Sequence, residues 1–367
     1  MDTKIASILL GKARRSSSLC WSSLFEKFGS SIGILNAPRK ELEKIVGAKA
    51  ASSIEELQKH WKWAEEEWER ASQLGVEILD LGDSRYPLRL KEIDYPPVVL
   101  YAQGDLSVLQ IPLWLAVVGS RRSSLYGVSQ TKRFALSLAE LGVVIVSGLA
   151  IGIDRQAHLS ALSCCGKTVA VLGSGLERIY PKQNKNLAKR IRLEGGLLLS
   201  EFPLQTPPCG YHFPWRNRVI SGLSKGVLVV EAGVRSGSLL TAQWALEQGR
   251  EIFGVPGPVD SPLSYGVNEL LKRGATLVQH PWEVLEEMLA ISQQKGEEIE
   301  LGELEHRILR VIHKGKKHLE QILAELNRPL QEVLPAMLRL ELACKVRKWP
   351  GDIYELLSPE KIPNQEE

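Results

Sequence analysis

Glycines and small polar residues recur where apolar runs end in the middle of the chain. Such stretches follow five of the runs, at 119–123, 147–150, 173–175, 231–238 and 256–258. Glycine lets a backbone approach a ligand, and the first amides of a helix lack intrahelical partners, so these loops are typical of phosphate-binding sites. One loop alone is a weak sign, because tight strand-to-helix turns also use glycine. Five together predict an anion-binding rim.

Cationic side chains occur in the same loops and strengthen this interpretation. The cationic candidates are Arg121, Arg122, Lys182, Lys185, Arg216, Arg218 and Arg235. A guanidinium presents its donors in a planar fork that matches two phosphate oxygens, so arginines at such an edge favour phosphate binding. Phe213 and Trp215 lie beside Arg216, and either ring could stack on an unpaired base or anchor the loop in the core. Anchoring is the favoured interpretation for Phe213, and for Trp215 the two are equal.

The acidic and nucleophilic residues do not form a catalytic set. Glu201 and Glu231 end apolar runs and could accept hydrogen bonds from loop amides or pair with the arginines, but the sequence places no second carboxylate beside either. Asp154 is interpreted as the N-cap of a helix, and His158, one turn on, as a core histidine. Gly173-Ser-Gly175 lacks the third glycine of a dinucleotide fingerprint, and the sequence has no Walker A motif. We therefore expect no catalytic residue, no metal site and no cofactor.

Short apolar runs alternate with helical patterns between residues 112 and 290. The runs are Leu115–Val118, Val143–Val146, Thr168–Leu172, Leu197–Leu199, Gly226–Val230, Glu251–Val255 and Ala275–Val278. They are almost continuously apolar, as expected of strands covered on both faces. Helical stretches such as Ser129–Leu141 and Ser238–Gln248 lie between them. The sequence predicts an α/β domain at 86–290 with a doubly wound, mostly parallel, Rossmann-like sheet, whose ligand edge carries the loops.

Residues 1–85 are expected to form a small helical domain, SAM-like or helix-hairpin-helix-like. Apolar residues at helical spacing lie on either side of Gly47, within 42–46 and 50–57. A helix-hairpin-helix binds DNA phosphates through backbone amides, but its usual second glycine is absent here. A helical packing domain is the favoured alternative.

The C-terminal part carries its own apolar pattern. A polar, charged linker is predicted at 291–302, and a third domain at 303–367. Two strands around Pro350-Gly351 follow three helical patterns, at 303–313, 318–326 and 330–341. Three helices and a β-hairpin predict a winged helix. Basic residues such as Lys316 and Arg347 favour DNA contact, whereas acidic residues on the same elements favour protein docking, and the two roles stay equally open.

The composition is typical of a well-cored intracellular protein. The chain has 367 residues, 44% hydrophobic and 24% charged, enough for two or three domains. Its net charge of +3 is too small to imply a nucleic-acid partner by itself. The five cysteines are scattered without a Cys-x-x-Cys pair, so neither a disulfide framework nor a zinc site is expected. Without a secretory signal pattern or a run long enough to span a bilayer, we expect a cytoplasmic protein with no membrane contact.

The motifs together resemble those of the DNA-processing protein A (DprA/Smf) family. They occur in the family's order over about 112–280, at 118–127 (VGSRRSSLYG), 146–158 (VSGLAIGIDRQAH), 170–175 (AVLGSG), 180–184 (YPKQN), 199–203 (LSEFP), 213–223 (FPWRNRVISGL), 229–232 (VVEA), 236–241 (SGSLLT) and 255–257 (VPG). The helical first segment and the winged-helix tail match common family architecture more loosely. Jointly the motifs are very specific.

The resemblance implies a recombination mediator that binds and protects single-stranded DNA, forms a homodimer through its Rossmann-like domain and loads the RecA recombinase during natural transformation. The implied DNA-binding residues are Ser120, Arg121, Arg122, Lys182, Asn184, Lys185, Arg216, Asn217, Arg218, Arg235, Ser236, Gly237 and Ser238. Arg235 stands where lysine is common and keeps the charge. Ile151 stands where many members have a charged or small residue.

Two alternatives of other classes share a Rossmann-like core. One is a lysine-decarboxylase-like nucleotide phosphoribohydrolase, an enzyme group with Pro-Gly-Gly-x-Gly-Thr and a glutamate soon after. Here Ser236-Gly-Ser-Leu-Leu-Thr241 is followed by Ala-Gln-Trp, so the acid is missing. The other is a nucleotide-sensing module without a DNA role, which competition between free nucleotides and an oligonucleotide would separate.

Overall fold

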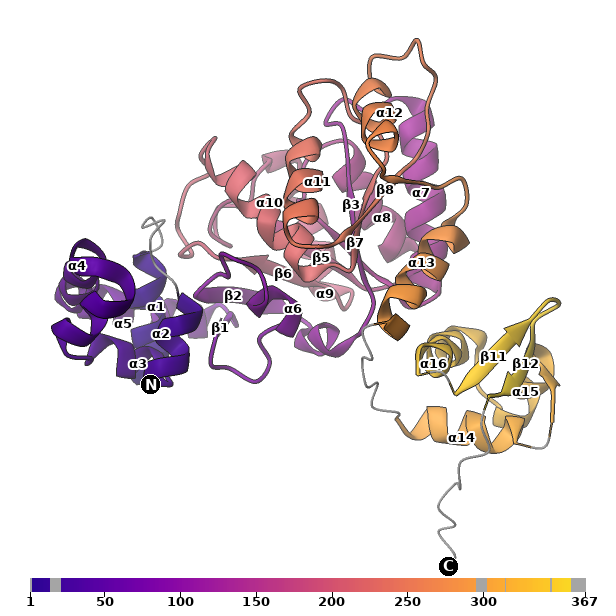
Figure 1. The fold of residues 1–367 in the computed structure, drawn as a ribbon, viewed down its shortest axis with the longest axis horizontal. Helices are drawn as coiled ribbons and strands as arrows, with labels where there is room; N and C mark the ends of the chain where they lie inside the picture. Colours follow the sequence, from indigo (N-terminus) through magenta and orange to yellow (C-terminus); the bar gives the residue numbers. More distant parts are fainter. Residues whose placement is uncertain (1, 14–20, 295–301, 314, 344, 358–367) are drawn as a thin grey trace, which may run out of the picture.

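A nine-stranded mixed sheet forms the centre of the protein. The computed structural model describes residues 2–13, 21–294, 302–313, 315–343 and 345–357 (Figure 1). The strands are β1 Glu77–Asp80, β2 Val99–Gly104, β3 Trp114–Val118, β4 Val144–Ser147, β5 Thr168–Leu172, β6 Leu197–Ser200, β7 Gly226–Val229, β8 Glu251–Gly254 and β9 Thr276–Leu277. Their order across the sheet is β1-β2-β6-β5-β4-β3-β7-β8-β9.

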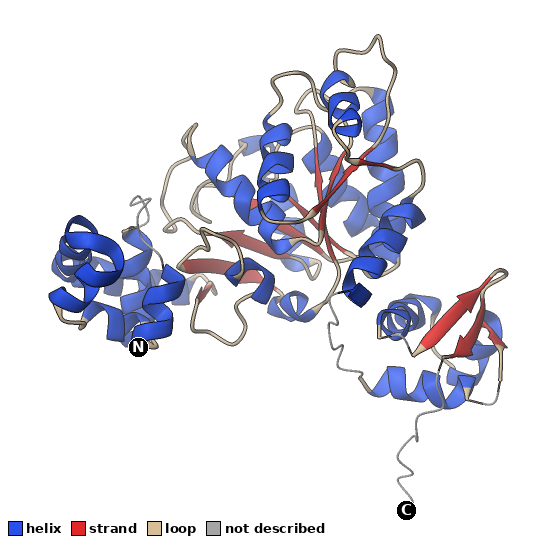
Figure 2. Ribbon diagram, viewed as in Figure 1, coloured by secondary structure: helices blue, strands red, loops and turns tan. Residues whose placement is uncertain are grey.

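Helices cover both faces of this sheet (Figure 2). They are α6 Leu88–Lys91, α7 Leu125–Glu140, α8 Ile153–Ser163, α9 Lys185–Leu193, α10 His212–Leu223, α11 Gly237–Glu247, α12 Tyr265–Lys272 and α13 Pro281–Gln294, with short 3₁₀ turns η2 at Leu106–Gln110 and η3 at Lys182–Asn184. Among the described residues, no helix has the length and apolar character needed to cross a membrane.

The seven strands from β6 to β9 are parallel and confirm the predicted doubly wound sheet. From β3 the chain winds outward through β4, β5 and β6, and then returns to place β7 on the other side of β3. The strand order therefore reverses between β3 and β7. In such sheets the crevice for ligands opens beyond the carboxyl ends of the two strands at this switch point.

Alternate side chains of β3, β4 and β7 enter two different cores, as the pleat requires. Leu115 and Val117 of β3 pack with Phe134 and Leu138 of α7 on one face. The intervening residues, including Ala116, belong to the core on the other face, where α10 and α11 pack. Both faces are therefore covered by helices, which explains why the strands are almost continuously apolar.

The two antiparallel strands β1 and β2 were not predicted. β1 pairs with β2, and β2 pairs antiparallel with β6, which extends the sheet on that side. β1 lies inside segment 1–85, so the expectation of helix throughout that segment is wrong at 77–80. Glu-Ile-Leu-Asp has no strong strand pattern of its own, and its conformation depends on pairing with residues about twenty positions away. The proposed domain boundaries stay predictions.

The N-terminal helices pack at the β1–β2 end of the sheet (Figure 1). They are α1 Asp2–Lys12, α2 Trp21–Phe28, α3 Ser31–Leu35, α4 Arg39–Leu57, the 3₁₀ turn η1 Gln58–His60 and α5 Trp61–Gln73. Gly47 interrupts α4 with a non-helical backbone (φ 79°, ψ 162°), so two helical segments meet at this glycine as expected.

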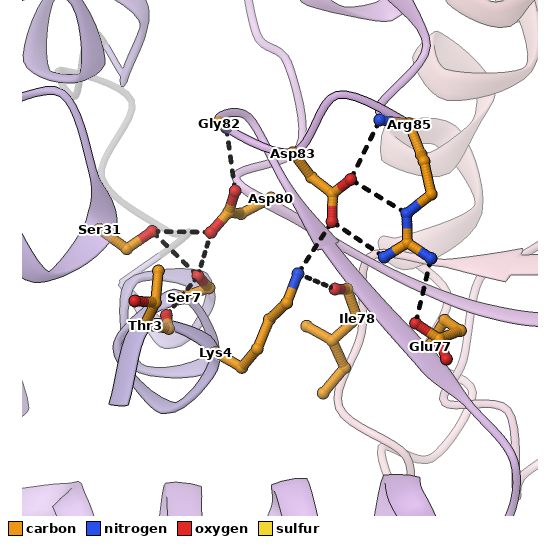
Figure 3. Close-up of polar contacts among 10 residues, drawn as sticks. All are labelled: Thr3, Lys4, Ser7, Ser31, Glu77, Ile78, Asp80, Gly82, Asp83 and Arg85. Atoms are coloured by element: carbon orange, nitrogen blue, oxygen red, sulfur yellow. Dashed lines mark hydrogen bonds and ion pairs between the residues drawn. The ribbon is translucent and has the colours of Figure 1, made fainter. Parts of the chain in front are cut away.

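A polar network joins these helices to the sheet (Figure 3). The Asp80 carboxylate, at the end of β1, accepts hydrogen bonds from the hydroxyls of Ser7 and Ser31 and from the Gly82 amide, the last at 2.9 Å. Nearby, the Lys4 ammonium forms an ion pair with Asp83 at 2.9 Å. Because Asp80 and both serines are buried, this network fixes α1 and α3 against the sheet.

The C-terminal part has a small core of its own and a second sheet. Its elements are α14 Glu303–Ile312, β10 Lys317–His318, α15 Leu319–Leu326, α16 Leu330–Leu342, β11 Val346–Trp349 and β12 Ile353–Leu356. The order of three helices and a β11–β12 hairpin matches the sequence expectation, and the assignment as a winged helix stays a prediction. The tail also contacts the central domain: Leu338 joins the α7–α13 core, and Pro335 packs against Gly142.

Candidate nucleic-acid interface

A cleft of about 770 Å³ opens beyond the carboxyl ends of β3 and β7. Its walls are the loop after β3, the loop after β7, the first turn of α10 and the N-terminus of α11. The amide of Ser120 donates to the Glu231 carbonyl at 2.8 Å, which ties the two loops together. The cleft therefore sits at the topological switch point, where the sequence placed its ligand edge.

Exposed arginines form the rim of this cleft. Arg121, Arg122 and Arg235 all line it with exposed side chains, as predicted from their loops. The Arg121 guanidinium carbon lies 5.5 Å from the centre of the Phe213 ring, so the cation stands over an aromatic face. Ser120 is buried beneath them and accepts a hydrogen bond from the Arg122 amide at 3.1 Å, which shapes the loop.

The N-terminus of α11 opens directly onto the cleft. Ser236 is its N-cap and accepts a hydrogen bond from the Ser238 amide at 3.4 Å. Gly237 is exposed, and a Cβ at this position would meet no atom within 4 Å. The side chain of Asn217 donates to the Gly237 carbonyl at 3.2 Å and holds the turn in place. The positive end of the helix dipole thus faces the space between the arginines.

The corresponding end of α7 is occupied by a carboxylate of the protein itself. Glu231 accepts hydrogen bonds from the amide and the hydroxyl of Ser124, the N-cap of α7. A Cβ at Gly127 would overlap this carboxylate, so only glycine fits there. The expectation that Glu231 accepts hydrogen bonds from loop amides is confirmed.

Asp154, in the first turn of α8, also accepts hydrogen bonds from backbone amides, but those amides belong to the loop before the helix. The N-cap of α8 is Gly152, so the interpretation of Asp154 as the cap is wrong. Its carboxylate instead accepts a hydrogen bond from the Gly148 amide at 3.1 Å and satisfies the loop after β4. Burial raises the pKa of Asp154, an effect that the Arg216 guanidinium opposes.

Arg216 forms the floor of the cleft. Its side chain is buried, donates to the carbonyls of Gly148 (2.8 Å) and Val171, and still borders both the cleft and a smaller side pocket. Burial lowers the pKa of Arg216 to about 10, while Asp154 raises it. The group therefore stays charged at neutral pH and places a fixed cation beneath the rim.

Two predicted binding residues are occupied inside the fold. Arg218 is buried and forms a bidentate ion pair with Glu201, at 2.8 and 2.7 Å. Asn184 is also buried, and its amide donates to the carbonyls of Leu149 and Ala150 at 2.9 and 3.1 Å. Neither side chain lines the cleft. Their geometry supports a role in positioning the loops, and a direct DNA contact for either stays a prediction.

Lys182 and Lys185 lie in η3 and at the start of α9, exposed, and line neither the cleft nor the side pocket. They follow Tyr180 and Pro181, which do line the side pocket. Any contact of these two lysines with DNA would therefore come from a strand that leaves the cleft on this side.

Two aromatic rings, those of Tyr180 and Phe213, border the side pocket, which has a volume of about 60 Å³. The ring centres of Tyr180 and Phe213 are 5.5 Å apart and inclined by 37°. Gly173 makes room for Phe213, because a Cβ there would come within 2.8 Å of the ring. Tyr180 is 43% exposed and was missed as a candidate, although it opens the Tyr-Pro-Lys-Gln-Asn motif.

His158 is a buried histidine beneath the site, as expected. Its Nδ1 lies 2.7 Å from the Thr168 hydroxyl, which itself donates to the Ile145 carbonyl, so Nδ1 carries the proton. Burial, followed by the charge of Arg216, lowers the pKa of His158 to about 3. Among the described residues, no three His, Cys, Asp or Glu side chains are grouped so that they could hold a metal ion.

Sequence comparison finds curated relatives that share the central part of the chain. Protein Smf of Escherichia coli is 53% identical over 202 residues, which cover 55% of this chain and 54% of the relative. The DNA processing protein DprA of Streptococcus pneumoniae is 46% identical over 205 residues, or 56% of this chain and 72% of the relative. The match to the Escherichia coli protein thus spans only about half of that relative's length.

Solved structures show the same architecture. The DNA processing protein A structure from Streptococcus pneumoniae matches with a TM-score of 0.67 and 36% identity, over 76% of this chain and 96% of that one. The protein of the same name from Helicobacter pylori, whose structure is described for its mode of binding single-stranded DNA, matches with a TM-score of 0.53 and 31% identity, over 60% of this chain and 98% of that one. The model of the DNA recombination-mediator protein A family matches residues 77–289, more than half of the chain, and the protein belongs to this family.

Proposed function

We propose that this protein binds single-stranded DNA in the cleft, without catalysis, and acts in the cytoplasm as a recombination mediator. The observation that carries the proposal is the unblocked N-terminus of α11, framed by Arg121 and Arg235 above the buried Arg216. The Helicobacter pylori relative is described as a single-stranded-DNA-binding protein, which supports the same role here.

The composition of the cleft favours a phosphate backbone over base edges. Helix amides and guanidiniums bind phosphate oxygens and carry no sequence information. Tyr180 and Phe213 bound a side pocket next to these groups, and an unpaired base can stack on their rings whatever its identity. In a duplex the bases are already stacked on each other and could not enter. The site therefore suits a single strand with little sequence preference.

Within this proposal the predicted residues divide by position. Arg121, Arg122, Arg235 and the Ser236–Ser238 turn contact phosphates, and Arg216 adds a fixed charge below them. Ser120, Asn217 and the buried Asn184 and Arg218 hold the loops that present these groups. Lys182 and Lys185 contact the strand only outside the cleft.

The partners implied by the family remain part of the proposal. We propose that the protein forms a homodimer through its Rossmann-like domain, protects incoming DNA and loads RecA onto it during natural transformation. Light scattering of the purified chain tests the dimer. RecA filament assembly on protein-bound single strands, followed by electron microscopy, tests the loading step, and no gain in filaments over DNA alone would contradict it.

Fluorescence anisotropy tests the binding step. Full-length protein is titrated into labelled single-stranded and double-stranded oligonucleotides of equal length at two salt concentrations. We expect tighter binding to the single strand, little dependence on its sequence and weaker binding at higher salt. Equal or tighter binding to the duplex would overturn the proposal. A parallel incubation with a nucleoside monophosphate, in which we expect no free base, tests the phosphoribohydrolase alternative.

A further inference from the structure

A second groove, of about 360 Å³, lies between the N-terminal helices and the loop that leads into α10. We name it the α1 groove. Its lining includes Lys12 from the end of α1 and Thr206, Pro207, Cys209, Tyr211 and His212 from the loop and the start of α10. The residues of α1 precede the segment that the family model matches, so family membership assigns no role to this wall.

The α1 groove and the cleft share one boundary, the short segment 209–213. Gly210 borders the cleft, its neighbours Cys209 and Tyr211 border the α1 groove, and Phe213 faces the cleft again. Gly210 is exposed, and a Cβ there would meet no atom within 4 Å. Gly210 therefore has no side chain that would obstruct the boundary, and an extended chain can cross its exposed backbone from one depression to the other.

Buried and bidentate contacts hold the walls of the α1 groove in place. The Leu204 amide donates to the Glu67 carboxylate of α5 at 2.6 Å, and burial raises the pKa of Glu67. Arg70, one turn along α5, donates to both carboxylate oxygens of Glu177, with Nη2 at 2.8 Å. The groove is thus preformed, because α5 fixes the loop that forms its far wall. A preformed site binds without the loss of entropy that ordering the loop would require.

The side chains at the α1 groove are complementary to a single-stranded nucleic acid. The Lys12 ammonium lies 4.4 Å from the centre of the Trp63 ring and offers a positive charge to a phosphate. The Tyr211 ring is 56% exposed at the boundary, where a base could stack on it, and Thr206 supplies a hydroxyl.

We propose that the α1 groove is a second DNA-binding site, which takes the part of a single strand that leaves the cleft across Gly210 and Tyr211. This inference rests on the proposed function of the cleft. It assigns the N-terminal helices a direct contact with the DNA, through Lys12 of α1. A strand long enough to fill both depressions then binds more tightly than one that fills the cleft alone.

The half-buried thiol of Cys209 provides a direct readout of the α1 groove. Full-length protein is saturated with a strand of about 6 or about 20 nucleotides, lengths chosen to fill one depression or both. It is then alkylated with a maleimide, and the modified peptides are quantified by mass spectrometry. We expect the long strand to slow modification of Cys209 and the short strand to leave it unchanged. Cys165 is the internal control. It is exposed and follows the C-terminal end of α8, and it should react equally in every sample.

Charge reversal tests the contact independently. Lys12→Glu should weaken binding of the long strand severalfold and lower its salt slope by at least 0.7, which is about one phosphate's worth for single strands, while binding of the short strand is unchanged. Lys40→Glu, on the exposed face of α4 and away from the α1 groove, is the matched control and should bind both strands as the parent does. Circular dichroism checks that both variants are folded.

The outcomes separate the two proposals. If both strands bind but Cys209 reacts at the same rate with the long strand present, or Lys12→Glu behaves like Lys40→Glu, the α1 groove is not a DNA site and the cleft proposal stands. Equal protection of Cys209 by the short strand would contradict the path from the cleft. If neither strand binds the parent protein, the proposed function fails, and the second site fails with it.

Discussion

The rim of the cleft and the layer beneath it contain the same residue type, arginine, in opposite circumstances. Arg121 and Arg235 on the rim are exposed and free to turn toward a ligand. Arg216 and Arg218, two residues apart on α10, are buried and donate to carbonyls or to a carboxylate. In the proposed site, burial, rather than residue type or motif, separates the arginines that are available to DNA from those that hold the loops in place.

The helix N-termini at this edge of the sheet also differ, in whether a carboxylate of the protein lies beside them. Glu231 occupies the end of α7, and Asp154 satisfies the loop that leads into α8. At α11 the cap is the small neutral Ser236, which adds no negative charge, so the positive end of the helix dipole still faces the cleft. A glycine-rich loop at a strand end is therefore an anion site only where the protein supplies no carboxylate of its own.

The largest effect that this comparison predicts is on stability. Arg218→Ala leaves the buried carboxylate of Glu201 without its partner, and we expect the free energy of unfolding to fall by about 3–5 kcal/mol. Urea denaturation followed by circular dichroism measures the change. Arg121→Ala, on the rim, is the control and should unfold at the parent's urea concentration. A variant at Arg218 with parental stability and lost DNA binding would place this residue in the DNA site instead.

The buried layer should also make stability depend on pH through His158. Its pKa of about 3 in the folded protein lies below the ordinary value of 6.5, so the unfolded chain takes up a proton first as the pH falls. The contribution of His158 to stability is complete above pH 6.5 and is lost between pH 6.5 and about 3, at about 1.4 kcal/mol per pH unit.

Urea titrations of the parent and of His158→Gln at several pH values isolate this contribution. The glutamine does not titrate, so the difference in unfolding free energy between the two proteins should change by about 1.4 kcal/mol per unit in that window and stay constant above it. Asp154, whose pKa is raised, contributes in the opposite sense and is common to both proteins. A constant difference at every pH would show that His158 is not held neutral by burial.

The central sheet was predictable because its strands need no distant partner to be recognised. Their apolar runs, the glycines after them and the helices between them are local, so all seven parallel strands and the ligand edge followed from the sequence. β1 was missed because its four residues become a strand only by pairing with β2. Local signals were enough where burial covers both faces of a strand, and they failed at the antiparallel end of the sheet.

The candidate site was predictable as a set of loops but not as a set of exposed groups. The sequence showed that Glu201 ends an apolar run and that Arg218 belongs to the basic stretch at 212–220. Only the folded chain brings their side chains into a bidentate pair. Asn184 likewise looked available and is enclosed by the backbone of residues 149 and 150. Tyr180 could have been found, since it is the first residue of the Tyr-Pro-Lys-Gln-Asn motif at 180–184. Its pairing with Phe213 joins residues 33 positions apart.

On the rim the predicted effects are on affinity rather than on stability. Arg121→Ala and Arg235→Ala should each weaken binding to every single-stranded sequence alike and lower the salt slope by about 0.7, because each removes one phosphate contact. Anisotropy titrations at several salt concentrations measure both quantities. A loss confined to some sequences would mean that the arginine reads bases.

The smallest effect is expected at Lys185. Its size shows whether the DNA contacts extend beyond the cleft. Lys185 is exposed at the start of α9, beyond the side pocket, so it can meet only a phosphate that has already left the cleft. Lys185→Ala should therefore weaken binding less than Arg121→Ala does. Lys189→Ala, one turn further along α9 and also exposed, is the matched control and should bind as the parent does. Anisotropy with one long strand compares all three variants. If Lys185→Ala weakens binding as much as Arg121→Ala does, the strand runs over α9 as well as through the cleft. An exposed cation near the cleft then contributes as much to affinity as one that lines it. If Lys185→Ala equals Lys189→Ala, the DNA contacts on this side end at the side pocket, and Lys185 drops out of the binding set.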